Sequence, residues 1–289
     1  MGVDRRAGFI LSAVLKTRIL TALVLIPLLV AALFYLPPGW LAVLFGVFIA
    51  VGAWEWAVLS GIASSPARMA YVLLLLICGA LCLYGLFIQP SLAISIFGSA
   101  ALWWLWALVD LIRCPVTDRG MFTARAGRLI GGALVLIPAW VGAVYLQATD
   151  PDFPRRLLYL FVLVWAADTA AYFVGSFFGK TRLAPHVSPG KTVEGVVGGV
   201  LGVVLLAWLC GTMIWRLESW ALVHWIGLAV VTALFSVVGD LTESKLKRIA
   251  GVKDSGSLIP GHGGVLDRID ALTAAMPVFV LGIVILAMF

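Results

Sequence analysis

The sequence predicts an all-α, polytopic integral membrane bundle of about nine transmembrane helices with a cytosolic N-terminus. Three observations predict it: the composition, the lengths of the apolar runs and the positions of the basic residues. Of the 289 residues, 63% are hydrophobic and 12% are charged, with a mean hydropathy of +1.10. Soluble domains are about half apolar and a quarter charged. Closed β-barrels also span membranes, but their alternating pattern does not occur here.

Nine apolar runs are close to the roughly 20 residues that a helix needs to cross a hydrocarbon core about 30 Å thick. They fall at 19–36, 39–59, 69–88, 92–112, 129–148, 156–178, 193–215, 221–239 and 271–289. Proline-containing turns separate several of them. The basic N-terminus followed by an apolar run resembles a signal peptide, but no A-x-A-type cleavage site follows. We therefore expect a retained first span.

The basic residues predict the orientation of these spans. With the N-terminus inside, 17 of the 20 Lys and Arg residues fall in cytosolic segments, and only Arg155, Arg156 and Arg216 fall outside. This positive-inside bias favours a cytosolic N-terminus and an odd number of spans. The bias and attraction to anionic lipid account for the net charge of +6, so no nucleic acid partner is expected.

The acidic residues divide the chain into two unequal halves. Residues 1–150 carry Glu55 and Asp110 as their main embedded acids and are expected to serve packing, lipid or dimer contacts. Residues 151–289 carry most of the remaining acids, at the predicted cytosolic ends of the last four runs. We expect a single membrane domain whose catalytic region is the second half. An ionisable group at the depth of Asp168 is itself a candidate functional residue.

Two carboxylates directly precede the last apolar run, 271–289. Asp267 and Asp270 are spaced i, i+3, so a helix that starts near Val265 places both on one face. Helix-dipole stabilisation is a structural alternative. With Asp240 from the preceding span, however, these hard oxygen ligands suit Mg²⁺. Gly263 and Gly264 would let backbone N–H groups approach an anion.

The basic residues between the last two apolar runs also favour binding of a phosphate. Lys245, Lys247, Arg248 and Lys253 follow Asp240, and basic side chains bind phosphate oxygens. The alternative is a basic loop that holds the helix end on anionic lipid. Acids, glycines and cations together favour metal-assisted phosphoryl chemistry.

A third segment contains two "GKT" triplets, at 179–181 and 190–192. Neither fits a P-loop: the first has three residues between its glycines where four are needed, and the second has Pro185 where the first glycine should stand. Ser188, Lys191 and Thr192 nevertheless precede the helix predicted from 193, and a helix N-terminus can bind phosphate. An ordinary Ser-Pro turn with a helix cap is the alternative.

The stretch "SKLKRIAGVKDSGSLIPGHGGVLDRID", residues 244–270, resembles the signature of the phosphatidate cytidylyltransferases, also called CDP-diacylglycerol synthases. That signature reads S-x-apolar-K-R, four residues, K-D, a spacer and P-x-H-G-G-x-x-D-R-x-D. The resemblance extends upstream through "VVGD", Asp168 and "SPGKTVEG". Many members of that family have a second lysine where this chain has Gly190. The first half is similar only in length and hydropathy.

The resemblance implies an enzyme of phospholipid biosynthesis that converts CTP and phosphatidic acid to CDP-diacylglycerol and pyrophosphate. It implies Mg²⁺ as cofactor, often with a monovalent cation such as K⁺, and metal ligation by Asp240 and Asp267 with Asp270 nearby. The site would face the cytosol at a bacterial-type inner membrane, and a homodimer is a family-level expectation. Phosphate contacts are expected from Lys191, Lys247, Arg248, Lys253 and Arg268. His262 orients a phosphate or is satisfied by backbone.

Three alternatives make different predictions. An ion-coupled transporter would show inverted repeats and acids in both halves. A CDP-alcohol phosphotransferase would need a D-G-x-x-A-R motif, and the sequence contains no Asp-Gly pair. A structural scaffold would leave the polar segment 244–270 unexplained. A membrane nucleotidyltransferase therefore remains the main hypothesis.

Overall fold

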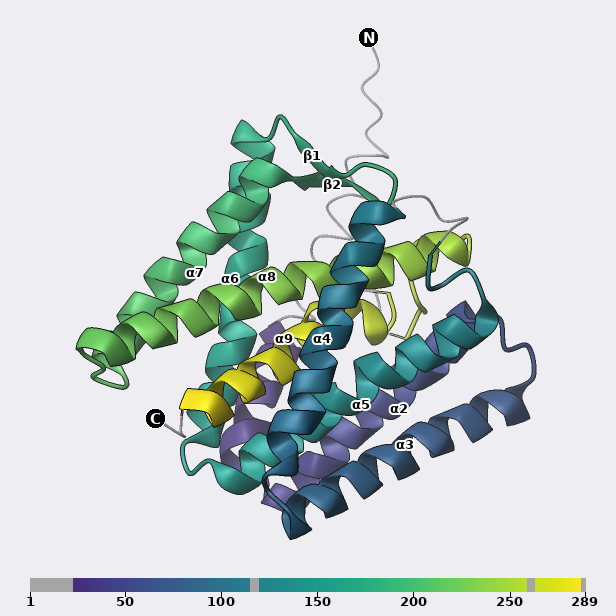
Figure 1. The fold of residues 1–289 in the computed structure, drawn as a ribbon, viewed down its shortest axis with the longest axis horizontal. Coiled ribbons are helices and arrows are strands. Elements are labelled where there is room, and N and C mark those ends of the chain that lie inside the picture. Colours follow the sequence, from purple (N-terminus) through teal and green to yellow (C-terminus); the bar gives the residue numbers. More distant parts are fainter. Residues whose placement is uncertain (1–22, 115–119, 259–262, 287–289) are drawn as a thin grey trace.

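The computed structural model describes residues 23–114, 120–258 and 263–286 (Figure 1). It confirms a helical membrane bundle, since eight of its helices are long and apolar enough to cross a bilayer. These are α2 (Pro38–Leu59), α3 (Ser65–Ile88), α4 (Leu92–Arg113), α5 (Arg125–Thr149), α6 (Phe153–Phe178), α7 (Val193–Met213), α8 (Ser219–Ile249) and α9 (Leu266–Leu286). A shorter helix, Leu23–Tyr35, precedes them. The predicted first run starts at residue 19, so its beginning lies outside the described residues.

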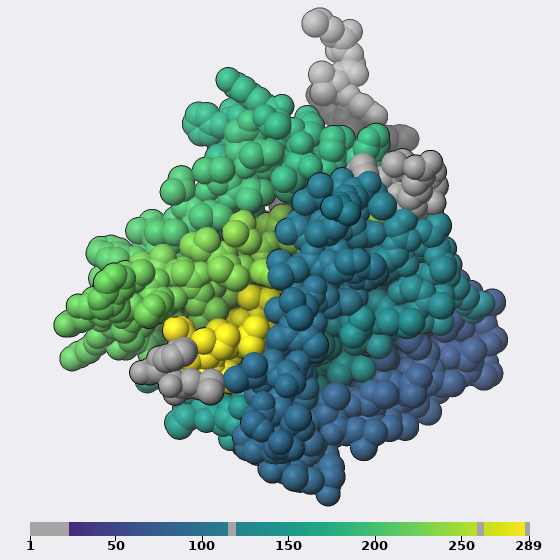
Figure 2. Space-filling model, in the orientation of Figure 1, coloured from purple at the N-terminus to yellow at the C-terminus, as the bar shows by residue number. Residues whose placement is uncertain are grey.

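Helix α9 lies at the centre of the bundle. It packs against α8, α4 and α5, and Figure 2 shows α4 lying across this face beside α9 and α8. Much of α9 between Ala271 and Val280 is buried, with Ala274, Ala275 and Phe279 fully inaccessible. Helices from both halves of the sequence therefore surround the segment that follows the predicted signature.

Close packing of α6 on α7 depends on small residues. A Cβ added to Gly195 would come within 2.8 Å of the Ala171 carbonyl oxygen, and one on Gly199 within 2.9 Å of the Ala167 carbonyl oxygen. Small residues allow transmembrane helices to approach this closely. Helices α7 and α6 in turn pack against α8.

A short antiparallel hairpin connects these two helices. Strands β1 (Arg182–Ala184) and β2 (Ser188–Thr192) pair with Arg182 opposite Thr192 and Ala184 opposite Ser188. Helix α7 begins directly after β2. The sequence analysis predicted the helix start but not the hairpin.

Helix α8 continues beyond its predicted apolar run. The run ends at Gly239, whereas the helix ends at Ile249. Thirty-one residues at 1.5 Å each make a helix about 46 Å long, so one end reaches past a hydrocarbon core of about 30 Å. The alternative of a basic loop after 239 does not hold, because Asp240, Glu243 and Lys247 belong to the helix. Hydropathy marks where the apolar surface ends, but helical hydrogen bonding continues.

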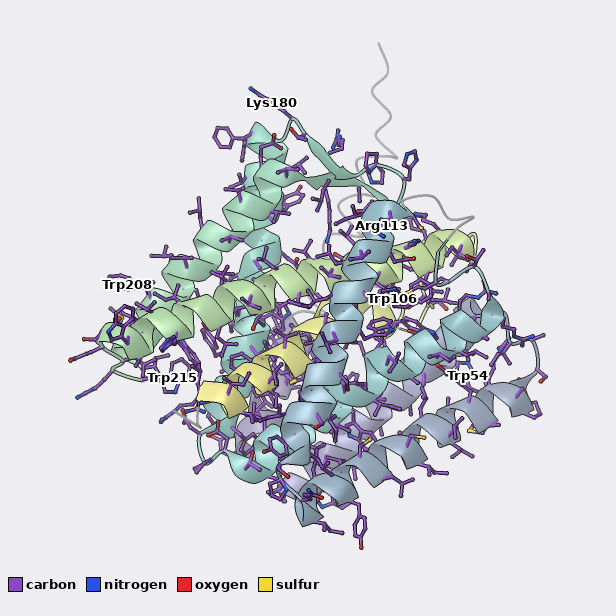
Figure 3. The ribbon with its side chains drawn as sticks, viewed as in Figure 1. Trp54, Trp106, Arg113, Lys180, Trp208 and Trp215 are labelled. Atoms are coloured by element: carbon purple, nitrogen blue, oxygen red, sulfur yellow. The ribbon has the colours of Figure 1, made fainter. Side chains whose placement is uncertain are left out.

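Figure 3 shows how charged and aromatic side chains are distributed. Arg113, at the end of α4, and Lys180, just after α6, lie in the upper part of the view, whereas Trp208, near the end of α7, and Trp215, just after it, lie at the left. The cytosolic location of the N-terminus remains a prediction.

Candidate active site

A cavity of about 590 Å³ lies between α6, the hairpin, α7 and α8. Its polar lining includes Asp168 from α6, Arg182 and Ser188 from the hairpin, Lys191 from β2 and Asp240 from α8. Aliphatic residues such as Val237 line the remainder. The structure thus places Asp168, the segment 188–192 and Asp240, all expected in the catalytic second half, around one cavity.

An ion pair forms the edge of this cavity. The Lys191 Nζ lies 2.5 Å from Asp240 Oδ2, and both side chains remain about a quarter exposed. Asp168 lines the same cavity. The Ser244 hydroxyl donates to Asp240 Oδ1 at 3.2 Å. Lys191 is thus paired with one carboxylate, Asp240, at a partly exposed position in a cavity that a second acid also lines.

Two hydrogen-bonded groups fix the start of α7. The Thr192 hydroxyl accepts a hydrogen bond from the Gly195 amide at 3.1 Å, which is an N-cap interaction. The Glu194 carboxylate accepts from the amides of Lys180 and Thr181 at 3.1 Å. Thr192 thus acts in this structure as a helix cap, and Ser188 and Lys191 are held at the cavity by the capped hairpin.

A second group of charges continues along α8 and into α9. The Lys247 Nζ donates to Glu243 Oε2 at 2.9 Å and to Asp267 Oδ1 at 2.7 Å. Asp270, also on α9, lies close to Glu243 and to Asp240. Ion pairs thus join Lys191 to Asp240 at the cavity and, farther along α8, join Lys247 to Glu243 and Asp267.

Asp267 caps its own helix. Its Oδ2 accepts hydrogen bonds from the Gly264 amide at 2.8 Å, the Ser255 amide at 2.9 Å and the Ser255 hydroxyl at 3.0 Å. Helix α9 starts at Leu266, so the prediction of a helix starting near Val265 is confirmed. The Gly264 amide, expected to face an anionic ligand, instead donates to this carboxylate.

The remaining predicted phosphate contacts lie around this segment. Arg248, Lys253 and Arg268 are exposed. The Arg248 Nε donates to the Val187 carbonyl at 3.3 Å and so ties the end of α8 to the hairpin turn. Gly263 has a φ of +83°, which favours glycine. His262 lies outside the described residues.

Two acids of the first half contact the signature segment, and sequence reasoning did not predict this. Glu55 in α2 accepts hydrogen bonds from the Val265 and Leu266 amides. Asp110 in α4 forms an ion pair with the fully buried Lys245, at 2.6 Å. The available signal was an isolated carboxylate within each apolar run, which predicts a partner but does not identify it.

The donor set can be tested against Mg²⁺. No group of three or more His, Cys, Asp or Glu side chains within the described ranges has metal-binding geometry. Mg²⁺, however, usually takes one or two carboxylates together with substrate phosphates and water. Asp240 borders the cavity beside Asp168, and a metal there would take the place of Lys191 on Oδ2 or of the Ser244 hydroxyl on Oδ1. Asp267 has both oxygens occupied by protein donors, so a metal there would have to displace one of them.

The fold and the cavity define a polytopic helical membrane protein with paired charges gathered where α6, α7 and α8 meet. The sequence model of the cytidylyltransferase family matches residues 16–286. The chain therefore belongs to the cytidylyltransferase family.

Curated relatives agree with this assignment. The chain is 43% identical to a phosphatidate cytidylyltransferase of Pseudomonas aeruginosa over 265 residues, which cover 92% of this chain and 95% of the relative. It is 39% identical to the enzyme of the same name from Haemophilus influenzae, over 92% of this chain and 97% of that one. A Brucella suis relative of that name is 36% identical over 60% of this chain and 69% of its own length.

Proposed function

We propose that this protein is a phosphatidate cytidylyltransferase, which converts CTP and phosphatidic acid to CDP-diacylglycerol and pyrophosphate. The observation that carries the proposal is the Lys191–Asp240 ion pair at the cavity edge, in a chain whose relatives bear that enzyme's name. The cavity volume, about 590 Å³, is within the usual range for small-molecule sites.

The reaction is a displacement at phosphorus. A phosphate oxygen of phosphatidate attacks the α-phosphorus of CTP, the bond from that phosphorus to the bridging oxygen breaks, and pyrophosphate leaves with the electron pair. The nucleophile is already anionic at neutral pH, so little general-base assistance is needed. The main barriers are repulsion between two anions and misorientation, which cations and positioning overcome.

The proposed roles of the residues in binding the two substrates follow from their positions. Lys191 borders the cavity and is the cation best placed to bind a CTP phosphate, with Ser188 beside it. Arg248, Lys253 and Arg268 are exposed near the end of α8 and the start of α9, where a lipid phosphate can reach them. Lys247 holds Asp267 in place, because its ammonium is enclosed by two carboxylates.

We infer that Mg²⁺ is the cofactor and that Asp240 is the carboxylate that holds it, with Asp267 as the second expected ligand and Asp270 nearby. When bound, Mg²⁺ would neutralise charge on the phosphates of the nucleotide. An assisting monovalent cation such as K⁺ stays a prediction from the resemblance.

We further infer that the site faces the cytosol at a bacterial inner membrane. The charge distribution supports this orientation, since 17 of 20 basic residues fall in the segments that include 179–192 and 250–265. CTP is a cytosolic nucleotide, and phosphatidate lies in the leaflet, so both substrates would meet at that surface. A homodimer remains an expectation from the resemblance.

The proposal is tested with purified protein in detergent micelles that contain phosphatidate, CTP and Mg²⁺. The expected products are pyrophosphate and a cytidine liponucleotide, identified by mass spectrometry. Omission of phosphatidate or of Mg²⁺ should abolish both. Release of pyrophosphate without a lipid product, or formation of neither, would overturn the proposal.

A further inference from the structure

A buried carboxylate of the first half holds the segment that leads into α9. Glu55 lies on α2 and is 6% exposed. Its Oε1 accepts a hydrogen bond from the Val265 amide at 3.0 Å, and its Oε2 accepts from the Leu266 amide at 2.7 Å. The Ser255 hydroxyl also lies 2.9 Å from Oε2. One side chain thus binds both ends of the segment 255–266.

The backbone of this segment is shaped to admit Glu55. A Cβ on Gly264 would come within 2.5 Å of Glu55 Oε1 and 2.6 Å of Oε2, and one on Gly256 within 2.6 Å of Oε1. Two glycines therefore leave the space that the carboxylate occupies. Such close approach is a specific use of glycine.

Ser255 connects Glu55 to the signature carboxylate. Its hydroxyl lies 2.9 Å from Glu55 Oε2 and 3.0 Å from Asp267 Oδ2. A hydroxyl carries one proton and can donate to only one of them at a time. The positions of Glu55 and Asp267 are therefore coupled through one side chain and through the first turn of α9.

We infer that Glu55 is a positioning residue for the nucleotidyl transfer, an inference that rests on the proposed function. It does not touch substrate, because it is buried and does not line the cavity. It fixes the amides of Val265 and Leu266, and through them the orientation of Asp267 and Asp270. The first half of the chain thereby takes part in organising the active site.

The first test replaces Glu55 with glutamine in the full-length protein. A Gln amide nitrogen cannot accept a hydrogen bond, so either Val265 or the Leu266 and Ser255 pair loses its acceptor. We expect kcat to fall about 10- to 100-fold, as small misplacements of reacting groups do, with the KM for CTP unchanged. Hydrogen exchange should rise in peptides covering 255–266 and nowhere else.

Asp110→Asn is the matched control. Asp110 is a buried first-half acid that also contacts the signature region, through Lys245 on α8, but it has no hydrogen bond to Asp267 or to segment 255–266 among the described residues. We expect this variant to lose stability while its kcat per folded molecule stays at the wild-type value. A fall in kcat as large as that of Glu55→Gln would show that any buried first-half acid matters equally and would overturn the inference.

A double-mutant cycle with Ser255→Ala separates positioning from general packing. Residues that act through one contact are non-additive. We expect Ser255→Ala to lower kcat in the wild type and to have little further effect in the Glu55→Gln background. Fully additive effects of the two substitutions on kcat would overturn the inference. An unchanged kcat in Glu55→Gln would also overturn it, as would faster hydrogen exchange throughout the bundle. If the wild type forms no liponucleotide, the proposed function fails, and the exchange measurement still reports whether Glu55 holds the segment.

Discussion

The Lys191 ammonium lies 2.5 Å from the Asp240 carboxylate and joins the hairpin before α7 to helix α8 at the edge of the cavity. The pair is partly exposed, and Asp168 lies nearby as a further acid. We expect a phosphate that enters the cavity to replace Asp240 as the partner of Lys191. This exchange of partners links the geometry to substrate binding.

Lys191→Ala should lower kcat/KM for CTP about 100-fold, because a charge-assisted phosphate contact contributes roughly 1.5–3 kcal/mol and an ion-pair partner of Asp240 is lost as well. Steady-state kinetics in micelles measures this. Lys180→Ala is the control, since Lys180 lies just before the same hairpin with its side chain exposed. An equal fall in kcat/KM for CTP in both variants would contradict a specific phosphate contact of Lys191 and indicate a general effect of positive charge.

Gly190→Lys should be tolerated and should strengthen CTP binding. A Cβ at Gly190 would meet nothing within 4 Å, and the residue lines the cavity. One added charge-assisted contact of roughly 1.5 kcal/mol corresponds to a KM about tenfold lower. Gly190→Gln controls for the added bulk. An unchanged KM for CTP in the Gly190→Lys variant would indicate that the CTP phosphates bind away from β2.

Lys247→Met should destabilise the protein by about 3–5 kcal/mol, because it leaves Glu243 and Asp267 without their shared cation in a buried site. Denaturant titration in mixed micelles reports the free energy of unfolding. Arg155→Ala, which removes an exposed ion pair, should change it by about 0.5 kcal/mol or less. A Lys247→Met protein as stable as the control would mean that the enclosure of this ammonium is not energetically important.

Gly264→Ala should reduce both activity and stability, because the new methyl group would overlap the Glu55 carboxylate and the Ser255 hydroxyl. Those partners are buried and hydrogen-bonded, so they cannot move without losing a bond. Gly227→Ala in α8 is the matched control, with nothing within 4 Å of its Cβ. Thermal unfolding and turnover of the two variants should differ clearly; matching values would argue against the tight fit around Glu55.

The sequence predicted the helical bundle well, because membrane spans are marked by long apolar runs. It also predicted the start of α9, since helix-start signals are local patterns. Joint action of Asp240, Asp267 and Asp270 at one metal site stays a prediction. The extension of α8 to Ile249 was missed because hydropathy does not record helical hydrogen bonds among charged residues.

Long-range pairings could not be read from the sequence. Glu55 meets Leu266 across 211 positions and Asp110 meets Lys245 across 135, and no local pattern encodes either partner. Likewise, the enclosure of Lys247 between Glu243 and Asp267 distinguishes it from the exposed Arg248 only once the helices are packed. The spacing of the signature motif does not distinguish Lys247 from Arg248.

The most direct test of the central claim follows a phosphorus label from CTP. With CTP labelled at the α-phosphorus, phosphatidate and Mg²⁺, the wild-type protein should transfer the label to the lipid fraction, and Asp240→Asn should transfer none. With CTP labelled at the γ-phosphorus, the label should leave as pyrophosphate. A γ-label in the lipid, or no α-label there, would contradict the account.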